Sequence, residues 1–371
     1  MIIRLDELQK ICSTILTAVD SNELSAITET VELKTVGTFL MMNVTNKEYF
    51  VSAKIDIKED VDFHATVNAK LFLKLISQIT TETVELIVSD TNMLIKGNGR
   101  YKLPLIYEGE LLLKLPEISI NNVTNEFDVS SDIFGSILTY NSKELLKEAN
   151  VRPICRMYYV DDMGAITFNT GACVNKFTLP EKVHLLFTDK LVKLFKLLNG
   201  TVHVIIGKDA ISGDIIQTKI KLSCDNVIIT AILSCDDTML NSVPASAIRA
   251  RVENIYPYGV TISKARMIEA INRLLLFNAG FGTKQQLKSY SDFIFSKDCV
   301  TIFDVAGENN EQVYYNNESN ITDDYSCKID LNQLKLTLES CNDEFVTITF
   351  GDNTAIVLSR RNVYNVIPEC H

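Results

Sequence analysis

Three kinds of residue in this sequence have types and spacing that could do chemistry: paired carboxylates, single histidines and one glycine-rich turn. The pairs are Asp161-Asp162, Asp236-Asp237 and Asp323-Asp324. Adjacent carboxylates can supply the oxygen ligands that Mg²⁺ and Ca²⁺ prefer. Each pair is flanked by residues typical of turns, so we interpret all three as solvated loops rather than a metal site.

The histidines and the glycine-rich turn do not match a catalytic motif. His64, His184 and His203 each lie alone in a strand-like pattern, with no Cys or Ser at the spacing of a nucleophilic site. Gly280–Lys284 follows a predicted helix and lacks the spacing of a phosphate-binding loop, so we interpret it as a flexible connection. The sequence thus predicts no catalytic residue, cofactor or metal; an enzyme with an unrecognised carboxylate site stays open as one alternative.

Composition excludes further classes of protein. The chain has 371 residues, 46% apolar and 22% charged, which fits two or three globular domains. A net charge of −11 excludes a basic protein that coats nucleic acid, so any contact with DNA must come from a local basic surface. Nine Cys without a C-x-x-C predict reduced thiols. The charged N-terminus and the lack of a long apolar run predict a cytoplasmic protein with no membrane partner.

The chain repeats one structural pattern six times: a strand, an amphipathic helix, then two or three alternating strands. The helices are expected near residues 5–21, 68–79, 131–141, 188–199, 264–277 and 331–341. Two such units fill each third of the chain, which predicts an α+β protein with three similar domains over residues 1–122, 123–246 and 247–371. The boundaries are expected in short polar or proline-bearing stretches near 120–124 and 241–257.

Local signals support the helices. Asn68, Thr188 or Asp189, and Asp330 stand where an N-cap is expected. The apolar stripe of the first helix is predicted to contain Leu5, Leu8, Cys12, Ile15, Leu16 and Val19, and that of the second contains Leu71, Phe72, Leu75, Ile76 and Ile79.

The opposite faces of several of these helices are basic, although the protein is acidic. The residues concerned are Lys70 and Lys74; Lys190, Lys193 and Lys196; Arg266 and Arg273; Lys335; and Lys10. On any one helix, lysines on an exposed face need no explanation beyond solvation. On several matching helices they predict a surface that attracts a phosphate backbone without reading bases. No aromatic residues interleave with them, which favours duplex over single-stranded DNA.

In repeat order and spacing, the whole chain resembles the bacterial β sliding clamp, the DNA polymerase III β subunit. Two local motifs support this resemblance: Val151-Arg152-Pro153-Ile154, and the terminal segment Asn365-Val366-Ile367-Pro368-Glu369-Cys370-His371. Residues 169–174 keep Gly and an apolar end but lose the Asp, His and Arg common in the family, and the last three residues also differ. These departures indicate a divergent member, for which a phage origin is one explanation.

The resemblance implies a ring made by a head-to-tail homodimer, with sheets outside and helices lining a channel for double-stranded DNA. Such a processivity factor has no catalytic activity and tethers DNA polymerase and the clamp loader through short linear peptides. By matched position, the peptide pocket would include Arg152, Cys155, Gly171, Val174, Val243, Ile367 and Pro368. The nine basic residues above would line the channel. The alternative is an acidic multi-domain scaffold that does not encircle DNA.

Overall fold

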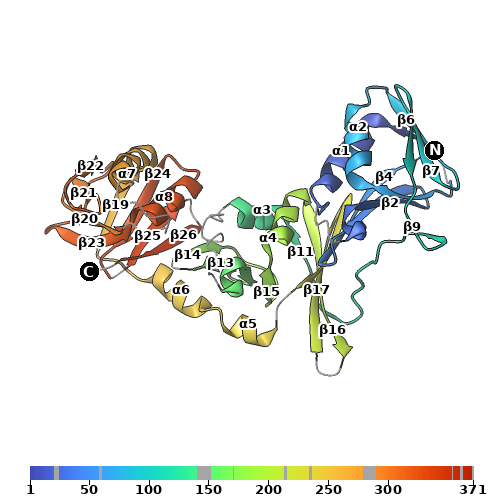
Figure 1. The fold of residues 1–371 in the computed structure, drawn as a ribbon. Coiled ribbons are helices and arrows are strands. Elements are labelled where there is room, and N and C mark those ends of the chain that lie inside the picture. The colour runs from blue at the N-terminus through green and yellow to red at the C-terminus, as the bar shows by residue number, and fades with distance from the viewer. Residues whose placement is uncertain are drawn as a thin grey trace. The chain divides into compact units, whose positions relative to one another are not determined.

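The computed structural model describes residues 1–20, 25–57, 61–139, 152–169, 171–212, 215–233, 236–278, 290–352, 354–359 and 362–369. The chain divides into two compact units (Figure 1). The first contains residues 1–135 and 190–236, and the second contains residues 136–189 and 237–371. Each unit is an antiparallel sheet structure with helices packed against it, the α+β class that the sequence predicts. None of the described helices is both long and apolar enough to cross a membrane.

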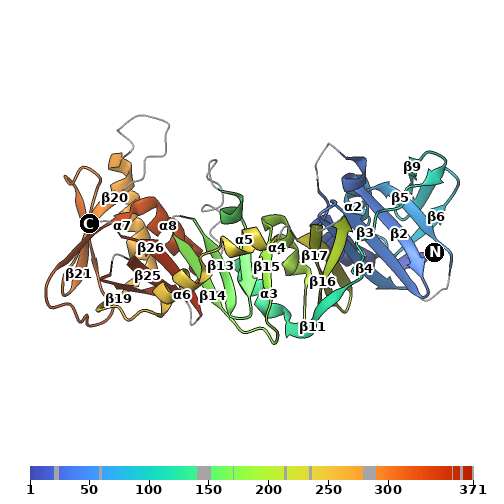
Figure 2. The ribbon, with the colours of Figure 1, turned by 90° about the horizontal axis from the view of Figure 1, so that it is seen from below.

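The first unit contains two large sheets. The smaller has the strand order β1-β6-β7-β8, and the larger has the order β11-β16-β17-β18-β4-β3-β2-β5. Figure 2 shows β2, β3 and β4 of the larger sheet side by side. The strands of the smaller sheet are β1 (Ile2–Arg4), β6 (Thr83–Val88), β7 (Asn92–Lys96) and β8 (Arg100–Pro104). Those of the larger are β2 (Thr30–Val36), β3 (Phe39–Thr45), β4 (Tyr49–Asp56), β5 (His64–Asn68), β11 (Val123–Ser130), β16 (Thr201–Ser212), β17 (Ile215–Cys224) and β18 (Val227–Leu233). A short hairpin of β9 (Tyr107–Glu108) and β10 (Leu111–Leu112) lies in the following segment.

Two helices of this unit, α1 (Leu5–Leu16) and α2 (Ala69–Gln78), pack side by side (Figure 1). The side chain of Asn68 accepts a hydrogen bond from the Leu71 amide, which confirms the predicted N-cap of α2. The predicted apolar stripes contain two errors, because Leu16 and Leu71 are both about half exposed. The buried stripe of α1 runs through Ile11 instead.

The middle part of the chain supplies two shorter helices, α3 (Ser131–Thr139) and α4 (Asp189–Leu194), with α4 continued by the 3₁₀ turn Phe195–Leu197. Phe134 and Phe195 join them through an edge-to-face contact with ring centroids 5.0 Å apart. The α-helix predicted over 188–199 is therefore shorter than expected. Two further 3₁₀ turns span Ala26–Glu29 and Pro153–Arg156.

The second unit also contains two sheets. Their strand orders are β15-β12-β13-β14-β26-β25-β24-β19 and β22-β21-β20-β23. The eight-stranded sheet consists of β12 (Tyr158–Asp161), β13 (Gly164–Phe168), β14 (Ala172–Lys176), β15 (His184–Phe187), β19 (Tyr258–Ser263), β24 (Phe345–Phe350), β25 (Thr354–Ser359) and β26 (Val363–Pro368). The four-stranded sheet consists of β20 (Tyr290–Phe295), β21 (Cys299–Phe303), β22 (Asn310–Tyr314) and β23 (Tyr325–Asp330). Helices α7 (Lys264–Asn278) and α8 (Leu331–Ser340) cover them, and Asp330 caps α8 as predicted.

Two helices, α5 (Asp237–Asn241) and α6 (Ala245–Glu253), occupy the stretch that the sequence assigned to a polar boundary. The sequence analysis predicted neither helix. The guanidinium of Arg249 on α6 donates to both oxygens of Asp161 on β12, at 2.6 and 2.7 Å, and both side chains are buried. This pair holds α6 against the eight-stranded sheet, since α6 also contacts β14 and β26.

The two eight-stranded sheets follow one rule. Each predicted domain contains two of the six predicted helices. In each sheet, the third strand after the first helix of one domain pairs antiparallel with the third strand after the second helix of the next domain in sequence. The pairs are β4 with β18, and β14 with β26. The sheets thus run across the predicted boundaries near 122 and 246, and the three-domain division itself stays a prediction.

Candidate nucleic-acid interface and partner pocket

The predicted DNA-contacting residues of the first unit are all exposed on helices, while the other sides of those helices are buried. They are Lys10, Lys70, Lys74, Lys190, Lys193 and Lys196. The ammonium of Lys190 lies 2.8 Å from Asp20 and that of Lys70 lies 3.5 Å from Glu29. The hydrogen bond to Asp20 raises the pKa of Lys190, so this lysine stays charged but partly neutralised.

The predicted residues of the second unit are more engaged. The guanidinium of Arg273 on α7 donates to both oxygens of Glu311 on β22, at 2.6 and 2.9 Å. Lys335 is half-buried and lies 3.8 Å from Glu339, one turn along α8. Only Arg266 is exposed with no ion pair to a described residue.

Of the nine predicted cations, four are therefore exposed and make no ion pair within the described residues: Lys10, Lys74, Lys196 and Arg266. Exposed ammonium and guanidinium groups on helices, away from the sheets, can contact phosphates in any sequence context. They carry no arrangement of donors and acceptors that would select a base. Chemically, the helical faces fit a weak, sequence-independent attraction to a phosphate backbone.

The predicted peptide-pocket residues occupy one region of the second unit but not one face of its sheet. Val174 on β14 is buried, and β14 pairs with β26, the strand that carries Pro368. Side chains alternate along a strand, so Pro368 and its neighbour Ile367 point to opposite faces. Ile367 is buried in the core formed with α7 and α8. Its side chain does not reach the face that carries Pro368.

Gly171 has a packing role in the structure. A Cβ at this position would lie 2.5 Å from the carbonyl oxygen of Val366 and would collide with the amide group of Gln333 on α8. The backbone of the turn before β14 therefore approaches β26 and α8 more closely than any side chain allows.

The remaining predicted pocket residues differ in exposure. Arg152 is exposed at the start of a 3₁₀ turn, where Cys155 is buried. Val243 is nearly buried between α5 and α6. Val151, Thr170, Cys370 and His371 of the quoted motifs lie outside the described residues. Membership of the pocket stays a prediction.

The residues that could have done other chemistry have structural partners. Asp161 is not in a solvated loop, as the sequence suggested, because it is buried against Arg249. His64 contacts Glu32 at 3.0 Å, and His184 contacts the hydroxyl of Tyr159 at 2.8 Å. Among the described residues, no group of three or more His, Cys, Asp or Glu side chains could hold a metal ion. The turn 280–284 lies outside them.

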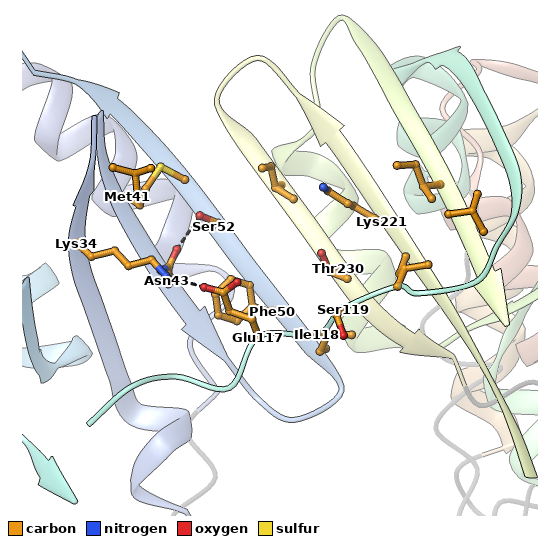
Figure 3. Close-up of a pocket in the computed structure, with 15 residues that line it drawn as sticks. Lys34, Met41, Asn43, Phe50, Ser52, Glu117, Ile118, Ser119, Lys221 and Thr230 are labelled. Carbon is orange, nitrogen blue, oxygen red and sulfur yellow. Dashed lines mark hydrogen bonds and ion pairs between the residues drawn. The ribbon is translucent and has the colours of Figure 1, made fainter. Parts of the chain in front are cut away.

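A cleft in the first unit was missed by the sequence analysis. It lies on the larger sheet at the junction of β4 and β18, and residues 117–123, the connector between the first and middle thirds, form its wall (Figure 3). Its lining includes Lys34, Met41, Phe50, Lys221 and Ile228. These residues alternate with core residues along their strands, a signal visible in the sequence, but only strand pairing across the junction brings them together.

The whole chain superposes on solved DNA polymerase III β subunits. The crystal structure of the β subunit from Pseudomonas aeruginosa matches with a TM-score of 0.78 and 14% identity, covering 100% of this chain and 99% of that one. The β subunit from Borrelia burgdorferi, solved with a natural product, gives 0.77 and 13%, covering 100% and 98%. The DNA polymerase sliding clamp from Bacillus subtilis gives 0.76 and 13%, also covering 100% and 98%.

No protein-family model matches the sequence, and no curated protein does. The likeness is therefore one of fold over the full length, reached with few shared residues. From Met1 to its last residue, this chain has the fold of the sliding clamp, the β subunit of DNA polymerase III.

Proposed function

We propose that this protein is a DNA sliding clamp, a ring that encircles duplex DNA and tethers the replicative polymerase. The full-length match in fold to β sliding clamps is the observation that carries this proposal. A threaded ring cannot leave its DNA sideways, so weak attraction suffices and no tight bond is needed. A sliding clamp needs no catalytic residue, and we expect this protein to have none. We also expect the protein to be cytoplasmic.

The exposed helix cations support this proposal. Lys10, Lys74 and Lys196 are exposed in a chain whose net charge is −11. Acidic surface elsewhere disfavours DNA outside a channel, while these helical faces favour it within one. Arg273 and Lys335 are weaker candidates, since each already lies beside a carboxylate.

Strand pairing supports a head-to-tail homodimer. The rule that pairs β4 with β18 and β14 with β26 predicts one further pair, β8 with β22. The described chain does not form this pair. Within the described chain, each is the end strand of a four-stranded sheet. Exposed sheet edges are templates for pairing with another chain. We propose that β8 of one copy pairs antiparallel with β22 of the next, which completes a third eight-stranded sheet.

Apolar side chains beside those edges support the same interface. Leu71 on α2 and Leu191 on α4 are both the third residue of their helix, yet Leu71 is 51% exposed and Leu191 only 3%. Buried residues recur at the same spacing along α1 and α7. When the two helices are aligned on these residues, Ala18, just after α1, corresponds to Phe277. Ala18 is fully buried, whereas Phe277 is 53% exposed. Leu71 and Phe277 are thus exposed where their counterparts on α4 and after α1 are buried, as a surface that a second copy covers would be.

The first test of the dimer is its mass. We expect light scattering to give about twice the chain mass of 41.6 kDa at micromolar concentration. Leu71→Glu places a charge in the interface and should give monomers, whereas Ile255→Glu, at a position 92% exposed, should not. A monomeric parent protein would count against the ring and favour an acidic scaffold that never encircles DNA.

The test of function is retention on DNA. After loading, the protein should remain on closed circular duplex and slide off once the circle is cut. A variant with Glu at Lys74, Lys193 and Lys196 should lose loading and processive synthesis while remaining folded and dimeric. The matched control places Glu at three exposed lysines away from these helices: Lys182, Lys208 and Lys297. Equal loss in both variants, or equal retention on cut and closed circles, would refute the proposal.

We also propose that polymerase and clamp loader bind through short peptides at the β14–β26 junction. Arg152 is exposed and can orient a peptide carbonyl or carboxylate, while the half-buried Pro368 contributes apolar surface on the strand paired with that of the buried Val174. Removing residues 367–371 should abolish binding of a polymerase C-terminal peptide, measured by fluorescence anisotropy, without changing the mass of the dimer. Unaltered affinity would exclude this site.

A further inference from the structure

The cleft at the β4–β18 junction, called the connector cleft below, is a formed site in the first unit. Its volume is about 500 Å³, within the range of protein ligand sites. Met41 and Phe50 line it on one side of the junction (Figure 3), and Ile205 on β16 and Ile228 on β18 line it on the other. All of these side chains come from the sheet face opposite α1 and α2, because the strand residues next to them are in the core.

Hydrogen bonds hold residues 119–122, the middle of the connector cleft's wall, against β16 and β17. The ammonium of Lys219 donates to the carbonyl oxygen of Ser119 and to the carboxylate of Asp209, both at 2.8 Å. That carboxylate also accepts the backbone amides of Asn121 and Asn122, at distances of 2.8 to 3.2 Å. Gly207 allows this close approach, since a Cβ there would lie 2.7 Å from the carbonyl oxygen of Asn122.

The start of the wall is held by an ion pair. The ammonium of Lys34 lies 2.6 Å from Glu117 and 3.8 Å from the buried Glu32. Burial acts to lower the pKa of Lys34, but these two carboxylates outweigh it and the pKa lies above its ordinary value. Lys34 is therefore a neutralised cation that anchors the connector.

Lys221 is different from Lys34. It lines the opposite side of the connector cleft and is partly buried (Figure 3). No hydrogen bond or ion pair joins its ammonium to any described residue. A cation in a cleft that is also lined by Ile205, Ile228 and the connector residues Ile118 and Ile120, in a strongly acidic protein, fits a ligand that brings both apolar groups and a negative charge.

We propose that the connector cleft binds an extended peptide segment of a partner protein, with apolar side chains on the cleft floor and one carboxylate on Lys221. Val36 and Val123, both about half exposed, add apolar surface to its lining. Its volume of about 500 Å³ suits several residues of extended chain. The site is separate from the pocket proposed at the β14–β26 junction, and it needs neither DNA nor ring closure.

The test starts from a displayed library of random twelve-residue peptides selected on the full-length protein. Recovered peptides are synthesised with fluorescein, and their affinities are measured by anisotropy. We expect peptides that contain an Asp or Glu among apolar residues. Lys221→Met should weaken them at least about tenfold, as should replacing their acid by its amide. Val36→Glu should weaken them too, and this exposed position tolerates the change in the folded protein.

The matched control is Lys208→Met, which removes an exposed lysine from the same sheet outside the connector cleft. It should leave affinity unchanged. Loss of binding in Arg152→Ala but not in Lys221→Met would assign the peptides to the other junction and overturn the proposal. Recovery of no peptide that depends on Lys221 would overturn it as well. A change of mass in Lys221→Met would instead identify a second copy as the occupant. None of these outcomes depends on DNA retention, so clamp activity is tested separately.

Discussion

Helix α6 offers a direct test of how a buried ion pair holds the second unit together. Arg249 and Arg251 lie two residues apart on this helix. Arg249 makes two charge-assisted hydrogen bonds to the buried Asp161, whereas Arg251 lies 3.3 Å from Asp352 with both side chains about half exposed. Replacing each arginine with Met removes the same charge from the same helix in two different environments.

We expect Arg249→Met to reduce the free energy of unfolding by about 3–5 kcal/mol, because it leaves the carboxylate of Asp161 buried without its counter-charge. For a unit of this size, that corresponds to a fall in Tm of roughly 6–20 °C. Arg251→Met should cost about 1 kcal/mol or less, as exposed pairs do. Differential scanning calorimetry can follow the transition of the second unit in both variants.

A double variant separates the charge effect from lost packing. With Asp161→Asn added to Arg249→Met, no buried charge remains, and part of the lost stability should return. Two results would refute this reasoning: Arg249→Met and Arg251→Met unfold at the same temperature, or the double variant is no more stable than Arg249→Met. Either would show that an unpaired, buried Asp161 carboxylate is not the cause of the lost stability.

The other two predictions concern Gly and Glu positions. Gly171→Ala should reduce stability by about 1–3 kcal/mol through overpacking. Gly135→Ala lies inside α3, where no atom of the described residues comes within 4 Å of the new Cβ, and it should raise stability by about 0.5–1 kcal/mol. A change of the same sign for both variants in chemical denaturation would contradict this. The hydrogen bond from Arg273 holds the pKa of Glu311 below its ordinary value of 4.5, so its stabilising effect is present above that pH and is lost as the pH falls through the lower, folded pKa. Glu311→Gln should therefore be less stable than the parent at neutral pH and converge with it on acidification, and a difference that is independent of pH would refute the assignment.

The local elements could be predicted because short-range rules determine them. The helical periodicity and the N-caps at Asn68 and Asp330 were confirmed. Leu16 and Leu71 were assigned to buried stripes and are exposed. Periodicity shows that a residue lies on an apolar face, but burial depends on what another element or another copy places there.

The candidate sites divide in the same way. Basic helix faces were visible in the sequence, and the lysines on them are exposed apart from the half-buried Lys335. Glu311 neutralises Arg273 from 38 positions away in the chain. Arg249 covers Asp161 from 88 positions away. Patterns among neighbouring residues do not show such pairs. Helix α6 was missed because it is short and follows a polar, proline-bearing stretch, and its contacts with the sheet help to hold it in place.

By itself the sequence determined six helix-and-strands units and an acidic chain with basic helices, since helix period, strand alternation and capping depend on residues a few positions apart. Only the tertiary structure decided which strands meet: β4 with β18, β14 with β26, and β8 and β22 left at sheet edges. The reason is that every antiparallel strand offers the same backbone donors and acceptors, so the choice of partner rests on packing between residues far apart in the chain. The connector cleft and the buried pair beneath α6 both exist because of that choice.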